Sequence, residues 1–133
     1  MNKFFLILSI FVLFAITEIK AQVSFSCNYR EYCDWNEKTQ KFETKCDGYE
    51  ESSLFVMNKS ETMFTHTTPE MKSTYYVDKK EYDEQNDVYT YDVTSDVGNK
   101  YFYIFDVKNK EIRAVFEQDG KTILLRFYVK AIF

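Results

Sequence analysis

Arg113 and Arg126 are the two side chains best suited to recognising a negatively charged group. Arginine occurs at only three positions, although lysine is plentiful. The guanidinium group binds carboxylates and phosphates through paired N–H donors. Tyr128 follows Arg126 by two residues, and Asp106 precedes Arg113 on the neighbouring predicted strand. We predict these four residues as the ligand-binding site: either Asp106 pairs with Arg113, or an anionic ligand or partner group lies between the arginines.

The turn at Asp119-Gly120 predicts that these arginines face each other. A two-residue Asp-Gly loop suits the left-handed backbone of a tight hairpin. It pairs Gln118 with Lys121, and therefore Arg113 with Arg126 on one face. The other face is wholly apolar, and a slip of one residue would move both arginines into it. We therefore expect that face, including Phe116 and Leu125, to belong to the core.

A second hairpin is predicted just before this one. If Asn109-Lys110 is its two-residue loop, Val107 pairs with Ile112 and Asp106 pairs with Arg113. Asn tolerates the left-handed conformation, whereas Lys is less suited to the second turn position. The three strands within residues 101–129 would then form the central sheet, with a partly apolar opposite face that is covered or lines a wet cavity.

Three cysteines, Cys27, Cys33 and Cys46, could form one disulfide and leave one thiol. A hairpin turning near Thr39-Gln40 places Cys33 opposite Cys46. A turn at residues 36–39 would instead favour Cys27 as a partner. We prefer Cys33–Cys46. No Cys-x-x-Cys spacing is present, so no metal site is predicted.

The sequence points to no catalytic machinery and no cofactor. His66 is the single histidine and lies between threonines, which is typical of an ordinary strand residue. The acidic stretch 78–87 lacks the glycine and the ligand periodicity of a calcium loop, so we interpret it as a solvated, charged connection. We therefore expect a protein that is not an enzyme.

Residues 1–21 are predicted to be an export signal. Lys3 precedes an apolar run from Phe4 to Ile16, and Ala21 suits cleavage before Gln22. Cleavage would reduce 17 basic and 21 acidic residues to 15 and 20, a net charge of −5. We expect a secreted, periplasmic or extracellular protein with no stable membrane insertion after cleavage. The absence of a basic stripe argues against nucleic acid as a partner.

Residues 22–133 are predicted to form a single all-β domain. Short β-rich runs follow one another from Ser53 onward with turn residues between them, and no segment shows a helical period. We expect an antiparallel up-and-down meander of about eight or nine strands, forming a small barrel or a strongly curved sheet. This strand count and order is similar to the architecture of lipocalin-like barrels. The Gly-x-Trp signature of that family is not present, because Cys33-Asp34 precedes Trp35.

Two functions fit these expectations. The first is a secreted, barrel-like binding protein for a small apolar or anionic ligand. The alternative is a secreted protein-interaction or structural module, inhibitor-like or envelope-associated, that uses an exposed aromatic face or a sheet edge. The partner is accordingly expected to be a small molecule or a protein.

Overall fold

The chain folds into an antiparallel β-barrel of eight strands with one short additional strand. The computed structural model describes residues 22–36, 38–42 and 46–133, so the predicted export signal lies outside the described residues. The described residues form nine strands, which confirms the predicted fold class. Their bounds are β1 Val23–Asn36, β2 Lys41–Phe42, β3 Asp47–Met57, β4 Met63–Thr67, β5 Lys72–Asp83, β6 Val88–Ser95, β7 Lys100–Asp106, β8 Glu111–Gln118 and β9 Lys121–Ile132.

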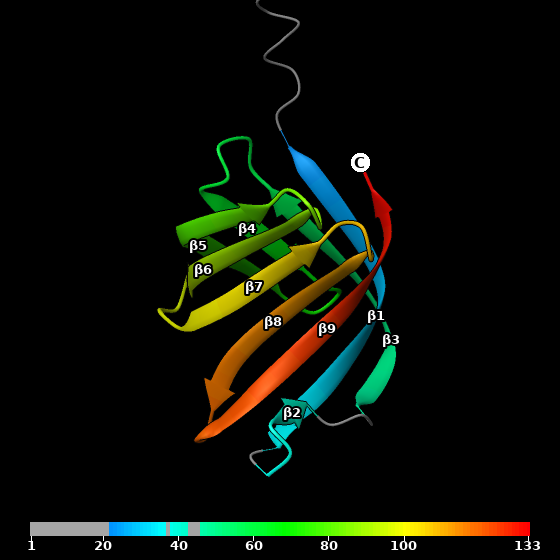
Figure 1. Cartoon of the computed structure of the whole chain (residues 1–133). Coiled ribbons are helices and arrows are strands. Elements are labelled where there is room, and N and C mark those ends of the chain that lie inside the picture. The colour runs from blue at the N-terminus through cyan, green and yellow to red at the C-terminus, as the bar shows by residue number, and fades with distance from the viewer. Residues whose placement is uncertain (1–21, 37, 43–45) are drawn as a thin grey trace, which may run out of the picture.

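The barrel closes because β1 pairs with both β3 and β9. The remaining strands follow chain order from β3 to β9, and β2 pairs only with the end of β1. Figure 1 shows β8, β9, β1 and β3 reaching further down than β4 to β7. We call the end with the C-terminus the upper end and the end with β2 the lower end. None of the described residues forms a helix long and apolar enough to cross a membrane.

Aromatic rings fill the barrel. Phe55 packs against the rings of Phe64, Tyr103, Phe105 and Phe127, with centroids 5.1–6.3 Å apart. Such large side chains bury more apolar area than any others and dominate the energetics of a core. The alternation of strand side chains explains the arrangement, because every second residue of a regular strand segment points inward. The interior is thus occupied by the protein's own side chains.

The β8–β9 hairpin has the register that the Asp119-Gly120 turn predicts. Phe116 pairs with Ile123, and Arg113 pairs with Arg126. Asp119 and Gly120 both have positive φ, 52° and 76°, as a tight hairpin requires. Part of the predicted core face is less buried than expected. Ile112, Ala114, Ile123 and Phe127 are buried, whereas Phe116 and Leu125 are only half-buried.

The β7–β8 turn differs from the prediction. Asp106 pairs with Glu111 and Ile104 with Arg113, so four residues, Val107 to Lys110, form the turn. The Asp106 carboxylate stabilises this longer turn, because it accepts hydrogen bonds from the Asn109 backbone N–H at 3.2 Å and the Asn109 side-chain amide at 3.0 Å. The shift is two residues, so each side chain keeps its predicted face.

Two strands are longer than expected. β3 begins at Asp47 rather than Ser53, and β5 continues through the charged stretch to Asp83. The predicted solvated connection at residues 78–87 is therefore mostly strand, and only Glu84–Asp87 turn the chain. An irregularity between Val77 and Lys79 changes the register there, and it places Lys79 opposite Asp92.

Candidate functional site

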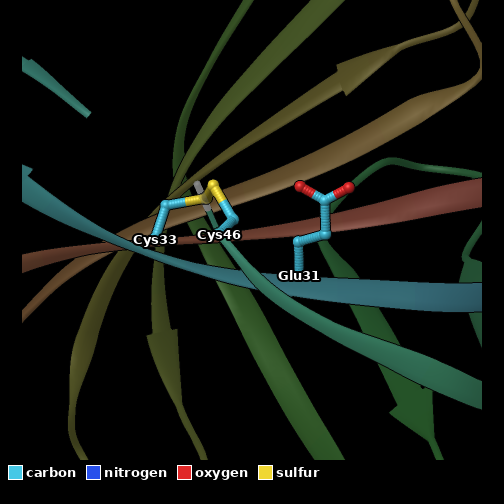
Figure 2. A group of neighbouring side chains, drawn as sticks. All are labelled: Glu31, Cys33 and Cys46. Carbon is cyan, nitrogen blue, oxygen red and sulfur yellow. A yellow bond between two sulfur atoms is a disulfide. The ribbon is translucent and has the colours of Figure 1, made fainter. Parts of the chain in front are cut away.

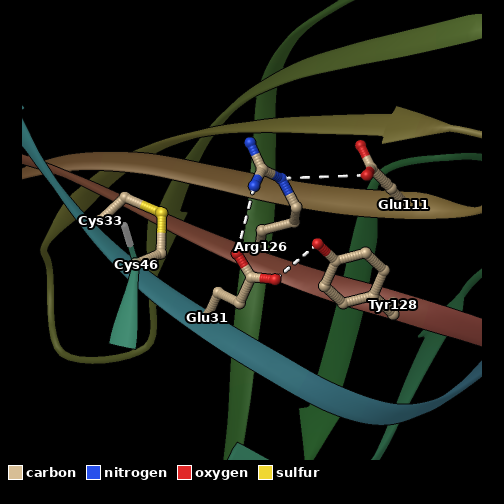
Figure 3. The surroundings of a disulfide bond; sticks show 6 residues. All are labelled: Glu31, Cys33, Cys46, Glu111, Arg126 and Tyr128. Atoms are coloured by element: carbon tan, nitrogen blue, oxygen red, sulfur yellow. Dashed lines mark hydrogen bonds and ion pairs between the residues drawn. A yellow bond between two sulfur atoms is a disulfide. The ribbon is translucent and has the colours of Figure 1, made fainter. Parts of the chain in front are cut away.

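The predicted site residues lie together on the outer wall of the barrel. Arg126 Nη1 lies 3.3 Å from a Glu31 carboxylate oxygen, and the Tyr128 hydroxyl donates a 2.6 Å hydrogen bond to the other oxygen (Figure 3). This hydrogen bond raises the pKa of Tyr128, because it stabilises the protonated hydroxyl beside a carboxylate. Glu31 comes from β1, which pairs Glu31 directly with Arg126 of β9.

Arg113 is paired with carboxylates as well. Its Nη1 lies 2.7 Å from Glu111 and 3.4 Å from Asp106, so the predicted Asp106–Arg113 pair is present across the shifted register. Although burial alone raises the pKa of Asp106, the hydrogen bonds from Asn109 and the charge of Arg113 outweigh it and hold that pKa below its usual range. Glu111 also lies 3.9 Å from Arg126 Nε.

Three carboxylates thus surround two guanidinium groups on this wall. We define these five charged residues and Tyr128 as the outer-wall network: Glu31, Asp106, Glu111, Arg113, Arg126 and Tyr128. Its formal charge is −1, and each guanidinium already has acidic neighbours. The geometry therefore suits a structural role, in which ion pairs hold β1, β7, β8 and β9 together. Binding of an anion at Arg113 and Arg126 stays a prediction, and such an anion would have to displace these carboxylates.

The disulfide lies beside this network. Cys33 and Cys46 are bonded, with Cα atoms 4.7 Å apart, and this is the pairing that the sequence favoured. β1 and β2 nevertheless pair Trp35 with Phe42 and Asn36 with Lys41, so this hairpin is not centred on Thr39-Gln40. The Glu31 carboxylate and the two sulfur atoms lie within 4.8 Å of one another (Figure 2). Metal binding requires free thiolates, which the disulfide removes.

Arg30 points into the barrel, which sequence analysis did not anticipate. The β1 registers with both neighbours are irregular between Cys27 and Tyr29, so the inward and outward alternation changes there. Arg30 consequently pairs with Phe127 and lies over its ring at 5.7 Å, and over the ring of Tyr49 at 5.2 Å. Its Nη1 lies 3.4 Å from Glu51.

His66 is another polar side chain inside the barrel. It is 8% exposed and stacks on Phe55 with ring centroids 4.0 Å apart. Burial, and to a lesser extent the charge of Arg30, lowers its pKa to about 4. Burial likewise raises the pKa of Cys27 to about 11, against the opposing effect of a hydrogen bond with Ser53. Both groups are therefore neutral at pH 7, and Cys27 is a thiol rather than a reactive thiolate.

A small pocket lies at the upper mouth of the barrel. It has a volume of about 210 Å³ and reaches the buried rings of Phe25, Tyr91 and Phe105. Ligand pockets typically occupy about 300–1,000 Å³. This pocket is smaller, because the aromatic core fills the space below it.

A much larger groove opens where β7 and β8 separate. Their ladder ends at the Phe102–Val115 pair, although β7 extends to Lys100 and β8 to Gln118. Figure 1 shows β7 and β8 diverging toward the lower end of the barrel. The groove has a volume of about 1150 Å³. We call it the β7–β8 groove, and it is lined by Asp78, Asp92, Val93, Asn99, Lys100, Tyr101, Phe102, Val115, Phe116, Glu117, Gln118 and Thr122.

The β7–β8 groove joins the outer surface to the core. Tyr101 and Phe116 come from the inward faces of their strands, and their rings lie 5.2 Å apart. Phe102 and Val115 come from the outward faces, and Phe102 is 38% exposed. Apolar side chains, which we call the floor, and four charged side chains, which we call the rim, therefore line the same groove. Sequence analysis missed it because each strand is regular by itself and only their separation creates the space.

No protein family, curated protein or solved structure matches this chain.

Proposed function

We propose that this chain is an exported binding protein that holds a small, mainly apolar ligand in the β7–β8 groove. The observation that carries the proposal is that three aromatic side chains, Tyr101, Phe102 and Phe116, line a space of about 1150 Å³. Apolar surface that is rimmed by polar groups is typical of ligand-binding grooves. The filled barrel interior and the small upper pocket leave much less room for a ligand.

Export is part of the same proposal. The Cys33–Cys46 disulfide suits an oxidising compartment, and the sequence of residues 1–21 suits a cleaved signal. Cytosolic proteins rarely keep a stable disulfide. An extracellular binding protein of this size would also benefit from the covalent link between β1 and the start of β3.

The test is a titration of the folded protein with a neutral aromatic probe, 2-(1-naphthyl)ethanol. Backbone amide NMR should show the largest shifts at residues 99–102 and 115–118, with little change at the upper mouth. Phe102→Asn should weaken binding, because it removes an exposed ring from the floor. Phe133→Ser is the matched control, since Phe133 is 71% exposed at the other end of the barrel. Shifts centred on the upper mouth, or no shifts, would contradict the assigned site.

The alternative is a protein-interaction module, and one observation favours it. β3 pairs with β4 only from Leu54 to Met57, so its lower half has an unpaired edge on that side among the described residues. An extended segment of a partner could add to such an edge through backbone hydrogen bonds. A partner peptide that protects the amides of residues 49–53 from exchange, in a protein that binds no naphthyl probe, would favour this function.

A further inference from the structure

The charges around the β7–β8 groove indicate which end group its ligand carries. Three carboxylates line the groove, from Asp78, Asp92 and Glu117, and Lys100 is the single basic residue in the lining. The described lining therefore has a formal charge of −2. This inference rests on the proposed function, because it concerns the ligand of the same groove.

Lys100 is already engaged within the protein. Its Nζ lies 3.3 Å from Asp78 Oδ2, and the same carboxylate oxygen accepts a 2.6 Å hydrogen bond from the Thr94 hydroxyl. These hydrogen bonds lower the pKa of Asp78, with Thr94 as the main cause, so Asp78 stays ionised. Asp78 and Lys100 cancel as a pair and leave the excess negative charge on the other two residues.

Asp92 and Glu117 have no ion-pair partner among the described residues. Lys79 faces Asp92 across β5 and β6 and the charge of Asp92 acts on it, but its Nζ forms its ion pair with Glu81 at 3.1 Å. Glu117 pairs across the hairpin with Thr122, which carries no charge. Both carboxylates line the groove, so a bound cation would meet a net negative lining, whereas an anion would be repelled by it.

The floor provides a second attraction for a cation. The rings of Tyr101, Phe102 and Phe116 line the same space, and the face of an aromatic ring attracts positive charge. We infer that the β7–β8 groove binds an organic cation, an amine with an apolar body, rather than an anion. The apolar body lies against these rings, and the ammonium group lies on the side of the groove that carries Asp92 or Glu117.

Three naphthyl probes that differ only in their end group test this inference. They are 2-(1-naphthyl)ethylamine, 2-(1-naphthyl)ethanol and 1-naphthaleneacetate, titrated by calorimetry near neutral pH and at low salt. The amine should bind about tenfold more tightly than the alcohol, because the lining of the groove has a net negative charge, and the carboxylate probe should bind most weakly. Added salt should weaken the amine alone, since only that interaction is a screened attraction.

Charge-neutral variants identify the carboxylates. Asp92→Asn and Glu117→Gln should each reduce amine binding by about threefold and leave alcohol binding unchanged. Glu84→Gln, in the exposed β5–β6 turn, is the matched control and should change neither. Equal binding of amine and alcohol, or an amine preference that survives the double variant, would overturn the cation inference while the proposed binding site stands. If none of the three probes binds, both proposals fall together.

Discussion

Arg113 and Arg126 lie directly opposite each other on β8 and β9, and the Glu111 carboxylate contacts both. Like charges at paired positions destabilise two strands. The pair is tolerated because Glu111, together with Glu31 and Asp106, neutralises it. The outer-wall network is thus a consequence of the hairpin register, which fixes the arginines in place.

Glu111→Gln should destabilise the barrel by about 1 kcal/mol, because it removes the carboxylate shared by two opposed arginines. Urea denaturation at low salt measures this loss. The double variant Glu111→Gln/Arg126→Gln should recover part of it, since one of the two positive charges is then gone. Glu84→Gln is the control for loss of an exposed carboxylate. If Glu111→Gln leaves the free energy of unfolding unchanged, Glu31 and Asp106 are sufficient to neutralise the two arginines.

The loss of unfolding free energy caused by a core substitution should depend on how buried the side chain is, and not on the residue type alone. Phe127 is 1% exposed, whereas Leu125 is half-buried at the edge of the core. Phe127→Ala should cost roughly 3–5 kcal/mol of unfolding free energy. Leu125→Ala should fall below the roughly 2 kcal/mol lower bound for buried leucine. Equal losses would mean that the lower end of the β8–β9 hairpin is as tightly packed as the barrel interior.

The disulfide and the buried thiol can be counted by alkylation without reduction. The folded protein should take up no label, because Cys27 is 2% exposed and Cys33 and Cys46 are bonded to each other. The denatured, unreduced protein should take up one label. Three labels would rule out the disulfide. The double variant Cys33→Ser/Cys46→Ser should lose about 3 kcal/mol, because the unfolded chain is no longer constrained.

The sequence predicts local pairings better than it predicts the site. Asp119-Gly120 allows one register with an apolar face, so the Arg113–Arg126 pair follows from turn chemistry alone. The β7–β8 turn is longer than predicted because the Asp106 side chain stabilises a four-residue loop, which the residue types also permit.

The interior position of Arg30 does not follow from turn residues. One irregular step between Cys27 and Tyr29 reverses the faces of the following residues, and no glycine or proline marks that step. The β7–β8 groove depends on the arrangement of four strands. β7 stays paired with β6, and β8 stays paired with β9, beyond the end of the β7–β8 ladder. Such long-range geometry leaves no local pattern.

Acid should destabilise the protein through His66. Its pKa is about 4 in the folded protein and about 6.5 in an unfolded chain, so the unfolded state binds the proton more readily. The stability contributed by the neutral side chain is complete above about pH 6.5 and falls as the pH drops toward about 4. Between about pH 7 and about pH 5 the loss should be about 2 kcal/mol.

A His66→Gln variant checks the origin of this acid effect. Glutamine does not titrate, so the slope of stability between about pH 7 and about pH 5 should largely disappear, even if the variant is less stable overall. Denaturant midpoints at several pH values make the comparison. A slope that persists in the variant would assign the acid sensitivity to carboxylates instead.

The final prediction couples Arg30 to His66 through the barrel interior. Burial is the main reason for the low pKa of His66, and the positive charge of Arg30 is the second. Arg30→Met removes that charge but keeps an unbranched side chain near Phe127. It should therefore raise the pKa of His66 above about 4 without restoring the ordinary value of about 6.5, because the imidazole stays buried.

Glu51→Gln should act in the opposite direction. It leaves the Arg30 guanidinium without the carboxylate that lies 3.4 Å from it, so His66 meets a less compensated positive charge and its pKa should fall further. NMR titration of the single imidazole measures both variants in the same way. A pKa of His66 that is unchanged in both variants would mean that burial alone sets it, and that the charges of Arg30 and Glu51 do not act on it.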